Sequence, residues 1–210
     1  MNKSVPSKGL KLVVGLGNPG APYANTRHNA GAWFIEALCK QQRLTLKNEI
    51  KFQASVGETS VNGQTVILAL SNTYMNHSGQ AVGSLAKYYH IPAEAILVVH
   101  DELDIPPGAL RFKTDGGHGG HNGLRDIIHH LKTREFHRLR IGIGHPRHQS
   151  LRDHEVVDYV LHKPSKEDEM KIQQAIMLGV SAFPWMVTGD FQKVMQDLHT
   201  TESQSPPKSH

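Results

Sequence analysis

The sequence predicts a single-domain α/β fold with a mixed, twisted central sheet and helices on both faces. Short strands that are apolar throughout, at residues 10–16 and 96–99, alternate with stretches of helical periodicity such as residues 30–42. Such strands are typical of a sheet covered on both faces, and the alternation is typical of α/β domains. A hairpin pattern at residues 52–70 makes the sheet mixed rather than parallel. A chain of 210 residues is long enough for one such domain and its core.

Turn and breaker residues delimit the elements of the first half. Asn62-Gly63 is a hairpin turn signal, and Pro92 stops the helical pattern that precedes it. The expected elements are a strand at residues 10–16 that ends near Gly17, a helix at 30–42, a hairpin at 52–70 and a helix at 78–89.

Two helix starts in the second half carry cap residues. Asn122 stands as an N-cap in the glycine-rich loop 116–123, and Ser165 followed by Asp168 resembles a capping box. The expected elements are a strand at residues 96–99, an extended segment at 109–113, a helix at 124–131, a strand at 136–143, a helix from 165 toward Pro184 and a short helix at 190–198.

We expect a flexible N-terminus at residues 1–8, the α/β domain at residues 9–199 and a disordered tail at residues 200–210, which contains nothing to bury. The N-terminus lacks the apolar centre of a signal peptide, and no apolar run approaches the ~20 residues of a membrane span. Cys39 is the only cysteine, which excludes an internal disulfide and a four-cysteine zinc site. These features predict a cytoplasmic protein that does not contact membranes.

Residues 15–20 match G-x-G-x-x-G after a strand, the fingerprint of a dinucleotide site. In that site a helix opens directly under the pyrophosphate, whereas here Gly20 and Pro22 disturb the first turn and the helical pattern resumes only near Ala30. We therefore expect no nucleotide cofactor, and interpret the motif as a tight turn that directs Asn18 into a crevice.

The loops after Gly17 and Val99 follow the carboxyl ends of two strands, where sites in such folds lie, so both should face one crevice. His28, between the first strand and the first helix, is a candidate general base because an imidazole titrates near working pH. Asp101, directly after Val99, is the candidate partner that would fix its tautomer. The alternative for Asp101 is a turn residue that caps the following Pro-Pro-Gly loop.

Three asparagines, Asn18, Asn76 and Asn122, lie in loops next to glycine or at helix starts. Each has the setting of an ordinary turn or cap residue. If they converge on one point, their side-chain amides would instead supply neutral donors and acceptors for a carbonyl group and its developing oxyanion.

Metal binding is the competing use of His100, Asp101, His118 and His121. The two histidines of His118-Gly-Gly-His121 lie in a glycine loop rather than at i, i+4 on a helix, so they are not aligned in advance for a metal. A serine nucleophile is not expected, because the chain has no G-x-S-x-G motif.

The net charge of +4 is distributed unevenly. Residues 111–152 carry nine basic and three acidic side chains, a local charge of +6, which leaves −2 for the rest of the chain. This distribution is compatible with a solvated basic face or with a groove that follows nucleic-acid phosphates. The basic residues are Arg111, Lys113, Arg125, Lys132, Arg134, Arg138, Arg140, Arg147 and Arg152.

Several motifs together closely resemble bacterial peptidyl-tRNA hydrolase, in the correct order from about Gly9 to His199. They are residues 15–20 (GLGNPG), Tyr23, residues 26–29 (TRHN), residues 73–79 (TYMNHSG), residues 100–104 (HDELD) and the glycine-rich residues 116–123.

The resemblance implies a monomeric cytoplasmic enzyme that cleaves the ester between a peptide and the 3′-terminal ribose of tRNA. Peptidyl-tRNA released prematurely from ribosomes would be its substrate, stalled ribosomal subunits a further partner, and no metal or cofactor is expected. It also implies a role for each matched residue. His28 would be the general base, and Asp101 would stabilise its basic form. Asn18 would contact the peptide backbone, and Asn76 and Asn122 would bind near the ester. On the tRNA, Tyr23 and Tyr74 would line the site of the 3′ end, and Lys113 and Arg140 would clamp an acceptor-stem phosphate.

Two other functions stay open from the residues themselves. One is a metal-dependent hydrolase that uses the histidine loop, and the other is a non-catalytic RNA-binding module that uses only the basic segment.

Overall fold

The central element is β1 (Leu12–Gly15), which pairs in parallel with β4 (Gln64–Ser71) and with β5 (Ile96–Glu102). The computed structural model describes residues 9–145 and 153–199. Its seven-stranded sheet has the order β2-β3-β4-β1-β5-β7-β6. The remaining strands are β2 (Lys47–Glu49), β3 (Ala54–Val61), β6 (Leu110–Thr114) and β7 (His137–Gly142).

The sheet is mixed, as the sequence predicts. The central strands run parallel, whereas the pairs β2/β3, β3/β4 and β6/β7 are antiparallel. Asn62 and Gly63 both adopt positive φ in the β3/β4 turn, which matches the twist of a two-residue hairpin and confirms that prediction.

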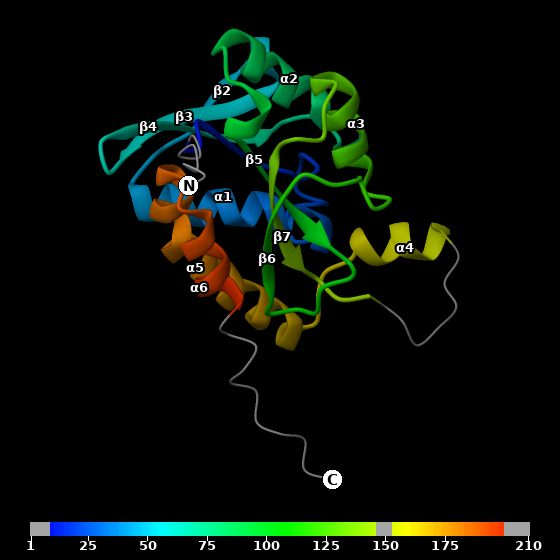
Figure 1. The fold of residues 1–210 in the computed structure, drawn as a ribbon. Helices are drawn as coiled ribbons and strands as arrows, with labels where there is room; N and C mark the ends of the chain where they lie inside the picture. The colour runs from blue at the N-terminus through cyan, green and yellow to red at the C-terminus, as the bar shows by residue number, and fades with distance from the viewer. Residues whose placement is uncertain (1–8, 146–152, 200–210) are drawn as a thin grey trace.

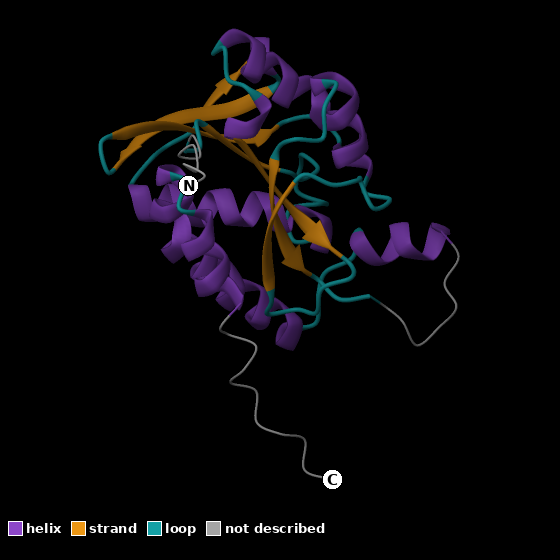
Figure 2. Ribbon diagram, in the orientation of Figure 1, coloured by secondary structure: helices purple, strands orange, loops and turns teal. Residues whose placement is uncertain are grey.

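Helices cover both faces of the sheet (Figures 1 and 2). Along β1, Val13 packs into the core on one face, which includes Phe34 and Phe183, whereas Leu12 and Val14 pack into the core on the other. This alternation explains why the strand is apolar throughout. The helices are α1 (Ala30–Gln42), α2 (Ser78–Tyr88), α3 (Asn122–Leu131), α4 (Asp153–Val160), α5 (Lys166–Thr188) and α6 (Phe191–His199).

Two expectations about helix ends differ from the structure. His121, rather than Asn122, is the N-cap of α3, and its ring nitrogen accepts a hydrogen bond from the Leu124 N–H. Helix α5 also continues past Pro184 to Thr188. The flanking Phe183 and Met186 are fully buried, and this packing outweighs the backbone hydrogen bond that proline cannot donate.

The cap prediction for Ser165 holds, and one strand and one α-helix are additional. Ser165 caps α5 by accepting a hydrogen bond from the Asp168 N–H at 3.1 Å. The short strand β2 and helix α4 have no counterpart among the expected elements. The segments 1–8 and 200–210, and the basic residues Arg147 and Arg152, lie outside the described residues. Among the residues described, no helix is long and apolar enough to span a bilayer.

Candidate active site

A cavity of about 720 Å³ lies where β1 and β5 end, as the positions of their loops predict. Residues 156, 157, 160 and 161, in and after α4, form an apolar wall, and the glycine loop before α3 also contributes to the lining. Of the residues that the sequence predicts for the site, the cavity is lined by Asn18, His28, Tyr74, Asn76, Asp101 and Asn122.

Close backbone packing brings His28 to Asp101. His28 lies in a short 3-10 helix, η1 (Arg27–Asn29), directly before α1. In α1, Gly31 packs against the carbonyl of Val99, and a Cβ at this position would overlap that oxygen. Only glycine therefore allows the start of α1 to lie this close to the end of β5.

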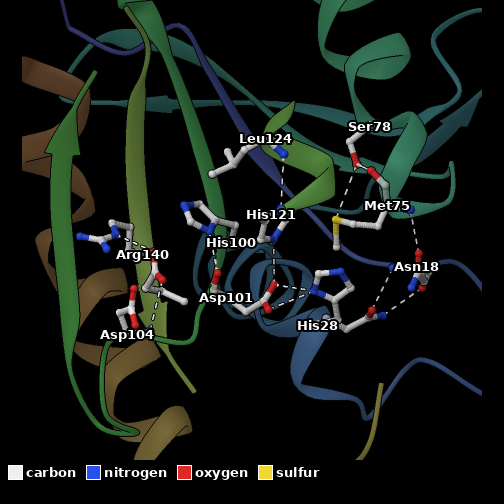
Figure 3. Close-up of polar contacts among 12 residues, drawn as sticks. Asn18, His28, Met75, Ser78, His100, Asp101, Asp104, His121, Leu124 and Arg140 are labelled. Atoms are coloured by element: carbon white, nitrogen blue, oxygen red, sulfur yellow. Dashed lines mark hydrogen bonds and ion pairs between the residues drawn. The ribbon is translucent and has the colours of Figure 1, made fainter. Parts of the chain in front are cut away.

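The His28 ring is oriented by the carboxylate of Asp101. Its Nδ1 lies 2.9 and 3.0 Å from the two carboxylate oxygens, so Nδ1 carries the proton and Nε2 keeps its lone pair (Figure 3). Burial alone would lower the pKa of His28, but the charge of Asp101 and its hydrogen bond outweigh this and raise it. The His28 side chain is 12% exposed. The structure thus has the tautomer that a general base requires.

Asp101 is buried at the end of β5, with 3% of its surface exposed. Burial alone would raise its pKa, but its electrostatic interactions with His28 and His121, including a hydrogen bond from each ring, hold the pKa well below its usual range. The carboxylate therefore stays ionised.

His121 is a second hydrogen-bond donor to Asp101, whereas the sequence groups the two residues only as an alternative set of metal ligands. Its Nε2 lies 3.1 Å from Asp101 Oδ1, while its Nδ1 accepts the N–H of Leu124 at 3.3 Å (Figure 3). A ring nitrogen that accepts an N–H has no proton, so the proton is on Nε2 and is donated to Asp101. From the sequence, His121 was a candidate metal ligand in a glycine loop and not a partner that orients Asp101.

His100 supports the site from behind. It is fully buried, and its Nδ1 donates to the backbone carbonyl of Asp101 at 2.7 Å. Burial lowers the pKa of His100 to about 3, with a further contribution from His121, although Asp101 opposes the shift. His100 is therefore a neutral packing residue at neutral pH and does not line the cavity.

The donor set of the cavity does not suit a metal ion. Ligand atoms of His28, Asp101 and His121 lie within 4.8 Å of one another, close enough for one cation. However, both ring nitrogens that face Asp101 carry protons, and freeing His121 Nε2 would move its proton to Nδ1 and break the hydrogen bond from Leu124. The set is arranged around the carboxylate and its two N–H donors.

Asn18 is held in one orientation by a reciprocal clamp. Its backbone N–H donates to Asn29 Oδ1 at 2.9 Å, and Asn29 Nδ2 donates back to the Asn18 carbonyl at 3.0 Å. The Asn18 side-chain oxygen accepts the N–H of Met75 at 2.7 Å. With its oxygen occupied, Asn18 offers its two amide N–H groups to the cavity. Asn29 is a further residue that the sequence does not predict for the site.

Asn76 and Asn122 present exposed amides to the same cavity, and Tyr74 adds an aromatic edge. Asn76 follows the buried Met75 in a 3-10 turn, and Asn122 is the first residue of α3. Tyr23 is outside the cavity lining but contacts Tyr74 edge to face, with ring centroids 6.3 Å apart.

Arg27, next to the candidate base, connects it to α4 and to the segment that follows α4. The guanidinium donates to the carbonyls of Tyr159, His162 and Lys163 at 3.3, 3.2 and 2.9 Å. It also lies 4.0 Å from the centroid of the Tyr159 ring. Arg27 is only 8% exposed, so this contact fixes the apolar wall of the cavity relative to His28.

The basic residues of β6 and β7 lie opposite one another but have different surroundings. The register pairs Arg111 with Arg140 and Lys113 with Arg138, which places all four on one face. Arg138 is buried and donates to the Gly116 carbonyl at 2.6 Å, so its role is structural. Lys113 is exposed, and Arg140 Nε lies 2.9 Å from Glu102 Oε2 (Figure 3). Neither Lys113 nor Arg140 lines the cavity.

Comparison with known proteins gives consistent matches over nearly the whole chain. Residues 12–206 match the family described as peptidyl-tRNA hydrolase. The peptidyl-tRNA hydrolase of Coxiella burnetii (strain CbuG_Q212) is 50% identical over 194 residues, covering 92% of this chain and 100% of that protein. That of Marinomonas sp. (strain MWYL1) is 51% identical over 193 residues, covering 91% and 97%. A crystal structure of peptidyl-tRNA hydrolase from Acinetobacter baumannii superposes with a TM-score of 0.87 at 47% identity, covering 93% of this chain and 96% of that one.

Proposed function

The chain belongs to the peptidyl-tRNA hydrolase family and hydrolyses peptidyl-tRNA, and we propose that His28 is the general base of this reaction. The observation that carries the proposal is the pairing of His28 Nδ1 with both oxygens of the Asp101 carboxylate inside the cavity. The substrate bond is the ester between the peptide and the 3′-terminal ribose of tRNA.

The reaction needs no covalent intermediate. His28 Nε2 takes a proton from a water molecule, and the resulting hydroxide attacks the ester carbonyl. Asp101 stabilises the imidazolium that forms, and amide N–H groups of Asn18 and Asn122 stabilise the tetrahedral oxyanion. When the intermediate collapses, the imidazolium returns its proton to the ribose oxygen that leaves. An aminoacyl ester is already activated, so a base worth ~10²–10⁴-fold together with these donors is sufficient.

The clamped orientation of Asn18 supports selection for a blocked amino group. Its side-chain oxygen is taken by the N–H of Met75, so the substrate meets two N–H donors. A peptide group offers a carbonyl oxygen to such donors. The free α-amine of an aminoacyl-tRNA is a cation, which the positive ends of the N–H dipoles disfavour. Asn76, on the same edge of the cavity, binds near the ester.

The acceptor stem of the tRNA is assigned to strands β6 and β7, outside the cavity lining. Lys113 and Arg140 bind an acceptor-stem phosphate, which positions the tRNA without reading its sequence. Tyr23 and Tyr74, which contact each other, line the site of the 3′ end. We further propose that the enzyme is a cytoplasmic monomer that needs no metal or cofactor. Its substrate is peptidyl-tRNA released prematurely from ribosomes, and stalled ribosomal subunits are a further partner.

One assay tests the base, the selectivity and the metal independence together. The substrate is an N-acetyl-aminoacyl ester of a short CCA-ending oligonucleotide, because such a fragment does not need Mg²⁺ to fold. We expect His28→Ala to lose ~10²–10⁴-fold in kcat/KM, and the unblocked ester to be a poor substrate. The matched control is His129→Ala, an exposed histidine of α3. Wild-type rates for His28→Ala, or activity that is lost in EDTA and restored by zinc, would refute the mechanism.

A further inference from the structure

A second groove, of about 540 Å³, adjoins the catalytic cavity on the side away from Arg140. It is lined by β2, by the 3-10 turn η2 (Ile50–Phe52), by the segment after β4 and by the start of α2. The lining residues are Pro19, Asn48, Ile50, Gln53, Asn72, Thr73, Tyr74, His77 and Gln80.

The groove is continuous with the catalytic cavity. Tyr74 lines both, and Pro19 in the groove directly follows Asn18 in the cavity. Asn76 and His77 continue this border, since Asn76 lines the cavity and His77 lines the groove. A chain that leaves the ester carbonyl past Asn18 therefore enters the groove directly.

The chemistry of the groove differs from that of strands β6 and β7, to which the acceptor stem is assigned. Among the described residues that line it, none is Asp, Glu, Lys or Arg. A phosphate backbone is bound through cationic side chains, as are available on β6 and β7. Amide and hydroxyl groups without net charge suit a ligand that is itself rich in neutral N–H and C=O groups.

Part of this polar surface is already fixed. Asn72 Nδ2 donates to Asn48 Oδ1 at 3.0 Å and to Ser55 Oγ at 3.1 Å, and the Asn72 backbone N–H donates to the Gln53 carbonyl at 2.9 Å. These bonds hold β2, the residue after η2 and the segment after β4 in fixed positions relative to one another. A preformed surface of this kind loses little conformational entropy when a ligand binds.

We propose that this groove binds the peptide portion of the substrate, beyond the amino acid that is esterified to tRNA. This inference rests on the proposed function, because it assigns one end of the same substrate. Ile50 is 84% exposed at the groove, which offers apolar contact to passing side chains beside the amides. Side-chain amides recognise a peptide backbone whatever its sequence, which suits a substrate whose peptide differs from one molecule to the next.

The test compares two substrates that share one tRNA. One carries a single N-acetylated amino acid, and the other carries an N-acetylated tetrapeptide ending in that amino acid. The variants are Gln80→Ala and Ile50→Ala, which alter the groove without touching the cavity lining. We expect the ratio of kcat/KM for the long over the short substrate to fall about fivefold in each variant, the loss that one neutral contact predicts.

Matched controls come from the outer face of α5. Gln173→Ala and Met170→Ala remove the same kinds of exposed side chain far from both cavities, and they should leave the ratio unchanged. An equal loss for both substrates would instead assign the groove to the terminal nucleotide and overturn the proposal. An unchanged ratio in both groove variants would also overturn it. Failure of the wild-type enzyme to cleave the short substrate would instead contradict the proposed function.

Discussion

The imidazole of His121 donates through Nε2 to Asp101 Oδ1 at 3.1 Å, so a single buried carboxylate accepts hydrogen bonds from two histidines. His121 is also the N-cap of α3, where its Nδ1 must stay unprotonated to accept the Leu124 N–H. An imidazolium at this position would lose the cap and would face the positive end of the helix dipole. His121 therefore orients Asp101 as a neutral donor, while His28 is free to take up the proton of the reaction.

His121→Asn separates these two roles. Asparagine is a good N-cap, so α3 should keep its stability, but its shorter side chain cannot reach Asp101. We expect kcat to fall ~10- to 100-fold, because a hydrogen bond to a charged group contributes about 1.5–3 kcal/mol. His121→Ala should lose a similar factor and also about 1 kcal/mol of unfolding free energy. Unchanged kcat in His121→Asn would show that the Asp101 contact is not used.

Asp101→Asn should change the pH profile of kcat/KM as well as its height. The base must be neutral, so activity falls as the pH drops through the raised pKa of His28. Without the carboxylate, burial becomes the dominant influence and lowers the pKa of His28. The acid limb should therefore move to lower pH, while the plateau falls ~10²–10⁴-fold. A profile that keeps the wild-type inflection would contradict the assignment of His28 and Asp101 as a pair.

His100 makes a prediction about stability. The ordinary pKa of a histidine is 6.5, whereas that of His100 in the folded protein is about 3. As the pH falls, the unfolded chain therefore binds a proton at this residue before the folded protein does. The stability that depends on neutral His100 is present above pH 6.5 and is lost progressively toward pH 3. His100→Gln keeps an N–H donor for the Asp101 carbonyl but does not titrate. Urea unfolding between pH 4.5 and 6 gives the slope of the free energy of unfolding against pH. This slope should be lower in His100→Gln than in the wild type, by up to ~1.36 kcal/mol per pH unit. Parallel slopes would exclude His100 as the source.

The fold could be predicted from sequence wherever burial leaves a periodic pattern. Strand β1 and the Asn62-Gly63 turn were predictable because each depends on local residues alone. The path of α5 through Pro184 was not, since it depends on packing of Phe183 and Met186 against distant elements. Local propensity cannot register such contacts.

The candidate site shows the same limit. His28 and Asp101 could be proposed as partners because both follow strand ends, which meet at one edge of the sheet. The part played by His121 depends on which of its nitrogens faces Leu124, and no sequence pattern encodes a tautomer. Asn29 and Arg27 were missed for a similar reason, since their partners lie across the fold.

Arg27→Met should loosen the cavity wall that the residues around Tyr159 form. The carbonyl of Lys163 would lose its donor, whereas those of Tyr159 and His162 would each keep one backbone N–H, so the free energy of unfolding should fall by about 1–3 kcal/mol. We expect KM to rise several-fold with a smaller effect on kcat, because the His28–Asp101 pair does not depend on the guanidinium. Tyr159→Phe is the matched control, since it removes only the hydroxyl contact with the Ile143 carbonyl and keeps the ring. Denaturation and steady-state kinetics measure both effects, and equal KM values for Arg27→Met and wild type would contradict this role.

Glu102 should compete with tRNA for Arg140. Arg140 Nε lies 2.9 Å from Glu102 Oε2, and the two side chains are 27% and 19% exposed, respectively. A phosphate that binds Arg140 must therefore displace the carboxylate. Such a partly exposed pair is worth at most about 1 kcal/mol, so Glu102→Gln should lower KM for full-length peptidyl-tRNA by about two- to fivefold at low salt.

Arg140→Ala and Lys113→Ala should raise KM and reduce the slope of log KM against log salt by about 1 each. Cleavage of a CCA-ending minimal ester, which has no acceptor stem, is the control and should respond to none of these changes. If Glu102→Gln and Arg140→Ala both kept the wild-type salt slope, the phosphate could not be bound at this pair.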